Sequence, residues 1–327
     1  MYAPQTYGTA LVLMLTSMVC WGSWPNFLKG LPRWRLEYFY LDFALGYLVT
    51  GVIYGVTLGS GRGSEPGFFD VLQTAGLREL VLAAIGGCIW NIGNILLLNA
   101  IMKVGLAVAF PIAAIPAIVL GIGSSYWLQP VGSPYALVAS ALILLLGAQV
   151  TAAAYRRLGG VATSSPTGGI GLALLSGILI GLFPPLVTAA MSGKVVLDPY
   201  SLSVAFMSGG FLSTIIAVPI LVRRPLIGQP GQPSEYFRGP PTFHALGLLA
   251  GFVWCSGTVL NFVSAGMVGI AISVGIGSGA PMVGALWGVL AWGEFAKGPQ
   301  KAKGLIAAAL GLYAAGVATM AIAYTMR

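Results

Sequence analysis

The fold is decided by an uninterrupted apolar stretch, VGLAVAFPIAAIPAIVLGIGSSYWLQPVGSPYALVASALILLLGAQVTAAAY, at residues 104–155. Its 52 residues contain no charged side chain. A helix needs about 20 apolar residues to cross the hydrocarbon core of a bilayer, so the stretch holds two membrane-spanning helices. Gln129-Pro130 and Gly132-Ser133-Pro134 lie near its middle and predict the turn between the two spans.

The same count on both sides of this stretch predicts eight further spans, which makes ten. One span each is expected in residues 1–28, 43–61, 80–102, 158–193, 199–222 and 304–326, and two in residues 239–293 with a turn near Ala265-Gly266. No basic residue precedes the first span, and Lys29 follows it instead of a small-residue cleavage site. We therefore expect this span to be retained and not cleaved as a signal peptide.

The composition excludes a soluble globular protein. Hydrophobic residues make up 57% of the chain and charged residues only 7%, against roughly 25% charged residues in soluble domains. The net charge of +8 comes from basic residues scattered singly and in pairs, so it does not indicate nucleic-acid binding. Cys20, Cys88 and Cys255 lie in apolar runs without disulfide or metal-ligand spacing, and we expect neither metal nor cofactor. The predicted class is an all-α polytopic membrane protein.

Lysine and arginine predict the orientation in the membrane, because cytoplasmic loops carry an excess of both. Loops after odd-numbered spans carry 12 of them: Lys29, Arg33, Arg35, Lys103, Arg156, Arg157, Arg223, Arg224, Arg238, Lys297, Lys301 and Lys303. The opposite side carries 4: Arg62, Arg78, Lys194 and Arg327. Both termini are therefore predicted on the extracytoplasmic side.

An internal repeat is visible when the sequence is shifted by 164 residues. This shift aligns Trp90–Gly121 with Trp254–Ala285, and it places Trp90 on Trp254 and Gly105 on Gly269. Five spans per repeat would give the two halves opposite topologies. We predict two five-helix inverted repeats, residues 1–157 and 168–327, joined by a cytoplasmic connector at residues 158–167.

Helix breakers occupy corresponding positions of the two halves. The fourth span carries Pro111 and Pro116, and the ninth carries Gly275, Gly277, Gly279 and Pro281. Backbone groups freed by such breaks are tolerated where protein or a polar cavity satisfies them. We predict a solute site near mid-membrane with Pro111, Pro116 and Gly277 in its wall. In the alternative interpretation these residues only bend their helices.

Polar and aromatic residues inside the spans are further candidates for solute binding. Asn91 and Asn94 are three residues apart and share a helix face, where their amides can bind a polar solute through donors and acceptors. Alternatively, they form hydrogen bonds between helices, as membrane asparagines commonly do. Trp24, near the end of the first span, is a candidate for stacking on the solute or an interfacial anchor.

Two acidic residues are candidates for ion coupling. Asp42 lies inside an apolar helix pattern, where a carboxylate is costly unless it is paired, protonated or facing water. It carries a proton or holds a polar solute, or else it is a shallow acid bound to a helix end or to Lys29, Arg33 or Arg35. Glu294 ends the ninth span, with a possible ion pair to Lys297 three residues on. His244, the single histidine, begins the eighth span, and we expect it to be interfacial.

The sequence offers no recognisable catalytic constellation. It has one histidine and no phosphate-binding Gly-Lys-Ser/Thr loop, and its loops are too short to hold an ATPase domain. We therefore expect a secondary transporter driven by gradients and not an enzyme. A metabolite or drug exporter is the alternative within transport, and a membrane-embedded enzyme or scaffold is the alternative outside it.

Several short motifs resemble the ureide permease family of the drug/metabolite transporter superfamily. They are Gly22-Ser23-Trp24-Pro25-Asn26, Tyr40-Leu41-Asp42-Phe43, Gly93-Asn94, Gly105-Leu106-Ala107-Val108 and the run from Trp287 to Glu294. The resemblance implies a ten-helix carrier that imports allantoin or related compounds such as uracil with protons, its termini outside.

Two features refine this resemblance. Plant members carry a long segment between spans 5 and 6, whereas this chain has only the connector Arg156–Thr167, which suggests a bacterial inner-membrane protein. The run Trp90-Asn91-Ile92-Gly93-Asn94-Ile95 also resembles bacterial rhamnose and glucose uptake carriers. A sugar is therefore the second candidate solute.

Overall fold

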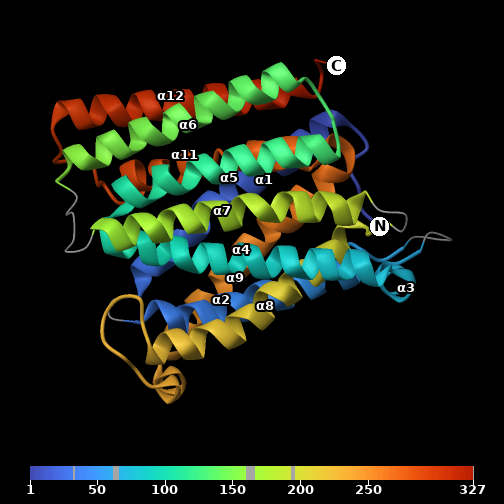
Figure 1. Ribbon diagram of the computed structural model, residues 1–327, viewed down its shortest axis with the longest axis horizontal. Coiled ribbons are helices and arrows are strands. Elements are labelled where there is room, and N and C mark those ends of the chain that lie inside the picture. Colours follow the sequence, from blue (N-terminus) through green and yellow to red (C-terminus); the bar gives the residue numbers. More distant parts are fainter. Residues whose placement is uncertain (32–33, 62–65, 160–165, 193–195, 327) are drawn as a thin grey trace. The chain divides into compact units, whose positions relative to one another are not determined.

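The structure is a computed structural model that describes residues 1–31, 34–61, 66–159, 166–192 and 196–326. All regular secondary structure in these ranges is helical, and ten helices are long and apolar enough to cross a membrane (Figure 1). The expectation of an all-α polytopic membrane protein with ten spans is confirmed. Arg33, Arg62, Lys194, Arg327 and most of the predicted connector 158–167 lie outside the described residues.

The helices follow the predicted spans closely. The ten spans are α1 with η1 (Tyr7–Ser23 and Trp24–Gly30), α2 (Leu36–Thr57), α4 (Leu77–Val104), α5 (Leu106–Leu128), α6 (Pro134–Arg157), α7 (Pro166–Met191), α8 (Pro199–Arg223), α9 (Pro241–Val268), α10 with α11 and η3 (Ile270–Gly277, Ala280–Leu286 and Trp287–Ala291) and α12 (Gln300–Ala323). Two short helices were not predicted, α3 (Phe68–Thr74) and η2 (Pro233–Arg238). Neither has the length or the apolar composition on which the span count depends.

Two glycines make equivalent turns between long helices. Gly105 separates α4 from α5 with φ 81° and ψ 155°, and Gly269 separates α9 from α10 with φ 79° and ψ 157°. Residues with a side chain rarely adopt this region, so glycine is required at both positions. The turn expected near Ala265-Gly266 therefore lies at Gly269, and the two glycines are a pair that the 164-residue shift aligns.

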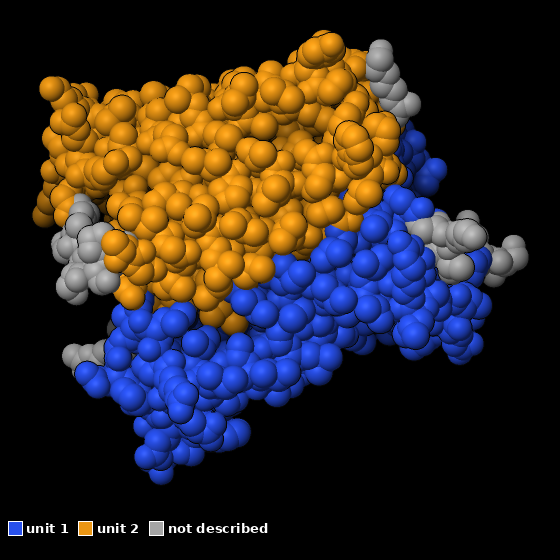
Figure 2. All heavy atoms as spheres, viewed as in Figure 1, with its two compact units in different colours: residues 1–92, 186–267 blue, residues 93–185, 268–327 orange. Residues whose placement is uncertain are grey.

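The chain forms two compact units, which Figure 2 shows in two colours. Unit 1 comprises residues 1–92 and 186–267, and unit 2 comprises residues 93–185 and 268–327. The division falls inside α4 and α7, so each of these helices contributes to both units. The units describe packing and combine parts of both sequence halves, and the predicted repeat boundaries stay a prediction.

Inside unit 1, glycines bring helix backbones together in reciprocal contacts. A Cβ at Gly46 of α2 would lie 2.4 Å from the Leu248 carbonyl oxygen of α9, and one at Gly209 of α8 would lie 1.9 Å from the Ala84 carbonyl oxygen of α4. Such close approach is possible only with small residues. Gly209 follows Gly46 by 163 residues and Leu248 follows Ala84 by 164, so the same contact occurs twice.

Aromatic residues of unit 1 also make contacts that occur twice, at positions that the sequence shift relates. Trp90 of α4 stacks on Trp254 of α9 with ring centroids 3.9 Å apart and planes 21° apart. Phe43 of α2 contacts Trp254 at 5.8 Å, and Phe206 of α8 contacts Trp90 at 6.2 Å. Offset stacks and tilted contacts of this kind stabilise apolar cores. The core of unit 1 is therefore an aromatic cluster built from residue pairs that the sequence shift relates.

Unit 2 is held together mainly by small residues. Figure 1 shows α6 and α12 side by side, and the Ser140 hydroxyl of α6 donates to the Gly316 carbonyl of α12 at 2.7 Å. A Cβ at Gly147 of α6 would lie 3.3 Å from the ring of Tyr313, which is buried on α12. Close helix packing in this unit thus depends on glycine and serine.

The expected helix break is present in the ninth span and absent from the fourth. The ninth span is interrupted at Ser278-Gly279 between α10 and α11, whereas α5 runs through Pro111 and Pro116. The break predicted for the fourth span is therefore wrong. A proline removes one hydrogen-bond donor but does not end a helix that neighbours support. Here Gly177 of α7 lets a neighbouring backbone approach α5 near Pro116.

Candidate functional site

Asp42 is a buried carboxylate with two side-chain partners. It lies in the second turn of α2 and is 2% exposed. Its Oδ1 accepts a hydrogen bond of 2.6 Å from the Tyr236 hydroxyl, and its Oδ2 lies 2.9 Å from Nδ1 of His244. The partners come from η2 and from the first turn of α9. His244, expected to be an interfacial residue, is thus a direct neighbour of the acid.

Two of the three basic residues considered as partners of Asp42 are accounted for, and neither is shown to pair with it. Arg35 pairs with Glu37 at 3.2 Å and donates to the Gln229 carbonyl at 2.7 Å. Arg33 is outside the described residues. In the structure Arg35 therefore binds Glu37 and the Gln229 carbonyl, and not Asp42.

Segment 225–240, between α8 and α9, is fastened to the start of α2. The Tyr38 hydroxyl lies 2.8 Å from the Gln232 carbonyl oxygen and 2.8 Å from Oε2 of Glu235. Burial, together with the hydrogen bond to the Asp42 carboxylate, raises the pKa of Tyr236. Tyr236 is therefore a protonated donor at neutral pH. Two sets of hydrogen bonds therefore join the segment to α2. One is from Tyr236 to Asp42, and the other is made by Tyr38, one turn earlier in α2.

Two glycines leave room for the cluster formed by Asp42, Tyr236 and His244. A Cβ at Gly247 of α9 would lie 2.4 Å from Cβ of Asp42. A Cβ at Gly239 would lie 2.8 Å from Nε2 of His244. Both distances are too short for a side chain. The glycines therefore set how closely α9 and the segment approach the acid and the imidazole.

Both ends of the Asn91 amide have hydrogen-bond partners inside unit 1. It is fully buried, its Nδ2 donates to the hydroxyls of Ser213 and Thr214 at 2.9 Å each, and its Oδ1 accepts from Tyr47 at 3.3 Å. The amide thus joins α4 to α8 and α2. This is the interhelical use of a membrane asparagine that was left open as an alternative. A solute that binds Asn91 would have to replace these partners.

The other predicted solute-binding residues lie in different places. Trp24 begins η1, is 6% exposed and stacks on Phe43 at 4.6 Å, so it belongs to the aromatic cluster of unit 1 and is not an exposed interfacial anchor. Asn94 is 7% exposed and lies in the part of α4 that belongs to unit 2. Pro111, Pro116 and Gly277 also belong to unit 2, on α5 and at the end of α10. Unit 1 therefore brings Trp24 and Asn91 together around α2.

Glu294 has a tyrosine partner. Its Oε2 accepts a hydrogen bond of 2.7 Å from the Tyr155 hydroxyl at the end of α6, and its backbone N–H donates to the Gly288 carbonyl at 2.9 Å. A Cβ at Gly288 would lie 2.6 Å from Oε2. The carboxylate therefore connects the end of α6 to the chain that follows η3.

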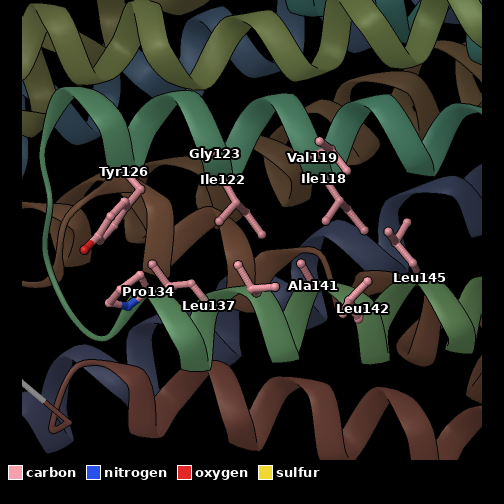
Figure 3. Close-up of a pocket in the computed structure, with 11 residues that line it drawn as sticks. Ile118, Val119, Ile122, Gly123, Tyr126, Pro134, Leu137, Ala141, Leu142 and Leu145 are labelled. Atoms are coloured by element: carbon pink, nitrogen blue, oxygen red, sulfur yellow. The ribbon is translucent and has the colours of Figure 1, made fainter.

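An apolar groove of about 280 Å³ lies between α5 and α6 (Figure 3). Tyr126 is the one residue of its lining with a polar side chain. Val119, Val138 and Leu142 in this lining are more than half exposed. The groove offers a polar solute almost nothing to bind, and its exposed aliphatic side chains are those expected of a surface in contact with lipid.

Sequence reasoning missed Tyr236, His244, Ser213 and Thr214 as partners of the candidate residues. Tyr236 and His244 are 194 and 202 residues from Asp42. Helix periodicity predicts faces of single helices, but it does not predict which distant helices meet. The single signal was the position of the lone histidine in the first turn of a span.

Ten helices long and apolar enough to cross a membrane define a multi-pass membrane protein. The ureide permease family matches residues 39–155. Ureide permease 4 and ureide permease 1 of Arabidopsis thaliana are 24% and 23% identical, each over 98% of this chain and 98% of the relative. Ureide permease 3 of the same plant is 32% identical over 39% of this chain and 38% of its own length. The chain is thus similar to ureide permeases, in residues 39–155 to the family as a whole and over nearly its full length to two plant members.

A solved crystal structure shares the fold. It has a TM-score of 0.63 and 18% sequence identity, and the match covers 95% of this chain and 96% of that chain. At this identity the likeness supports the architecture alone. The alignment with ureide permease 4 is 394 residues long, so the relative carries insertions that this 327-residue chain lacks.

Proposed function

We propose that this protein is a secondary active transporter that imports a small polar solute together with a proton. The solute would be a ureide such as allantoin or a nucleobase-like compound such as uracil. The permease relatives support the transporter class and the kind of solute. The observation that carries the coupling proposal is the carboxylate of Asp42, buried inside an apolar helix and hydrogen-bonded by Tyr236 and His244.

A coupled ion is required if the solute is accumulated. A ureide has no net charge at neutral pH, so the membrane potential does not act on it directly. One elementary charge that crosses 100 mV supplies about 2.3 kcal/mol. Asp42 can carry that charge as a proton. Removal from water disfavours the ionised form of a carboxyl group, so a buried carboxyl group can be protonated as well as ionised. Glu294 is the second coupling candidate, and it would take the place of Asp42 if Asp42→Asn still accumulated solute.

For the solute itself we propose contacts from Trp24, Asn91, Asn94, Pro111, Pro116 and Gly277. Trp24 is part of an aromatic cluster on which a planar solute can stack, and the two buried asparagines supply donors and acceptors. The ninth span is interrupted just after Gly277, and broken helices of this kind often line the solute sites of transporters. Substitution of Asn91 and Asn94 by Ala should raise KM in protein that remains folded. Unchanged kinetics would assign both amides to structure.

We further propose two five-helix inverted repeats, with both termini on the extracytoplasmic side of a bacterial inner membrane. The reciprocal contacts of unit 1 and the matching turns at Gly105 and Gly269 support the repeat. The lipid bilayer and the solute are the proposed partners, and nucleic acid is not. The oligomeric state is left open.

Uptake of labelled solutes into cells that express the protein tests this function. Allantoin and uracil should accumulate against a gradient, and a protonophore should abolish the accumulation. Uptake of rhamnose or glucose instead would support the sugar alternative. Resistance to toxic solutes, without uptake of any of these, would support the exporter. Empty-vector cells are the control.

A further inference from the structure

The described titratable groups that meet the Asp42 carboxylate are Tyr236 and His244, and they differ in what they can do with a proton. The tyrosine hydroxyl donates to Oδ1 and remains protonated at neutral pH. The imidazole beside Oδ2 has a second ring nitrogen, and an imidazole exchanges protons readily at neutral pH. One side of the carboxylate is thus a fixed donor and the other side is a group that can both give and take a proton.

The two members of the acid–imidazole pair differ in their access to solvent. The Asp42 side chain is 3% exposed, whereas the His244 side chain is 23% exposed. Nε2 of His244 lies on the far side of the ring from Asp42, against Gly239 of segment 225–240. A proton from the solvent therefore reaches the imidazole more easily than it reaches the carboxylate.

The contact with Asp42 determines the tautomer of His244 while the carboxylate is ionised. An ionised carboxylate can only accept, so Nδ1 must carry the hydrogen that faces Oδ2, and Nε2 then has a free lone pair. Two contacts of charged groups in the described residues lie in the next shell: Arg35 with Glu37, and Glu235 with the Tyr38 hydroxyl. Among the described residues, His244 is therefore the neighbour of Asp42 whose ring can accept a proton at one nitrogen and give one from the other.

We propose that His244 is the relay through which the buried Asp42 exchanges its proton with the solvent. This inference rests on the proposed coupling role of Asp42 and adds a second residue to it. In the uptake direction a proton binds Nε2, and the Nδ1–H proton passes to Oδ2. The products are a neutral carboxylic acid and a neutral imidazole with its hydrogen on Nε2. Release follows the same steps in reverse, so the proton count balances.

A pH-jump experiment on the purified protein in lipid nanodiscs tests this relay. Infrared absorption of the protonated carboxyl group, assigned by its loss in Asp42→Asn, reports the protonation of Asp42. His244→Asn keeps an amide N–H near the position of Nδ1 but cannot pass a proton on. We expect it to slow proton exchange by roughly a hundredfold, the scale of general acid–base assistance, and we expect added imidazole to restore the rate. Tyr38→Phe, which changes a tyrosine contact of the same segment, should exchange at the wild-type rate.

His244→Gln serves as a second variant if His244→Asn fails to fold, which thermal unfolding would show. Exchange at the wild-type rate in a folded His244 variant would overturn the proposal. So would slowed exchange that imidazole does not restore, because that result assigns His244 a positioning role. A carboxyl group at position 42 that does not titrate would also overturn it. The measurement needs no solute, so failure to transport a ureide would overturn the proposed function and leave the relay to be decided separately.

Discussion

Asp42 and Glu294 are carboxylates in different units, and each accepts a short hydrogen bond from a tyrosine: 2.6 Å from Tyr236 and 2.7 Å from Tyr155. Each also lies beside a glycine, Gly247 or Gly288, whose missing side chain leaves space for the acid. They differ in their surroundings. Asp42 is buried inside a helix next to an imidazole, whereas Glu294 is half-buried and follows the end of η3.

This difference separates two uses of the same chemical group. The Tyr155 hydroxyl and the Glu294 carboxylate hold two segments together. A buried carboxylate with an imidazole neighbour can, in addition, gain and lose a proton. We therefore expect changes at Asp42 to affect energy coupling and changes at Glu294 to affect stability.

The largest expected effect is the loss of coupling in Asp42→Asn. An asparagine keeps the size and hydrogen-bonding capacity of the side chain but cannot carry a proton. Accumulation against a gradient should vanish, while exchange of solute across the membrane stays measurable. Glu294→Gln should accumulate solute as the wild type does. Reconstituted vesicles with an imposed pH gradient provide the measurement. Accumulation by Asp42→Asn with the usual pH dependence would contradict the distinction between the two acids.

The second effect is on folding stability and compares the two glycines. A methyl group at position 247 would meet Cβ of Asp42 at 2.4 Å and the Phe39 carbonyl at 3.2 Å, both anchored to α2. A methyl group at position 288 would meet the mobile end of Glu294 at 2.6 Å. Gly247→Ala should therefore destabilise by about 1–3 kcal/mol, as overpacking does, and Gly288→Ala by less. Thermal unfolding in detergent would rank them, and the reverse order would show that the clash at Gly247 is relieved.

A smaller effect is expected when each tyrosine loses its hydroxyl. Tyr155→Phe removes one hydrogen bond to a half-buried carboxylate and should cost about 1 kcal/mol without changing the pH profile of transport. Tyr236→Phe removes a donor that favours ionised Asp42, so the pH midpoint of accumulation should move upward. The raised pKa of Tyr236 keeps that donor in place throughout the neutral range in the wild type. Identical pH profiles for the two variants would contradict the different roles assigned to Asp42 and Glu294.

The smallest expected effect on the protein comes from single cysteine substitutions that test its orientation in the membrane. The basic-residue count predicts that the loops near both acids face the cytoplasm. Single cysteines at Arg157 and Gln229, with Cys20, Cys88 and Cys255 replaced, should both be shielded from an impermeant thiol reagent in intact cells and react after permeabilisation. A cysteine at Gly61 is the matched control for the opposite side. Labelling of position 157 or 229 from outside would invert the predicted topology.

The sequence alone predicted the number and the approximate positions of the spans, because a long uncharged run can satisfy its backbone in a bilayer only as a helix. The exact ends differ, as α2 begins at Leu36 and the turn after α9 lies at Gly269. The α5–α6 turn was recognised from Gln129-Pro130 and the Gly-Ser-Pro run, whose residues favour turns. Asp42 was found because a single acid in an apolar helix is conspicuous. Its partners were not, because Tyr236 lies in a short helix without periodicity and the contact joins residues 194 positions apart. Asn91 was likewise recognised as buried and polar, whereas its partners on α8 depend on helix–helix register.

The pair Gly147 and Tyr313 has a consequence for the ancestry of the chain. α12 starts 166 residues after α6, and the same shift places Tyr313 on Gly147, which it contacts. If the two halves descend from one duplicated gene whose product paired with its own copy, this position faced itself and had to hold the same residue on both sides. Two glycines would leave a hole there and two tyrosines would collide. On that descent, a glycine could face a tyrosine only after gene fusion allowed each half to change independently. Trp90 and Trp254, in contrast, are the identical residues that a self-paired ancestor would require.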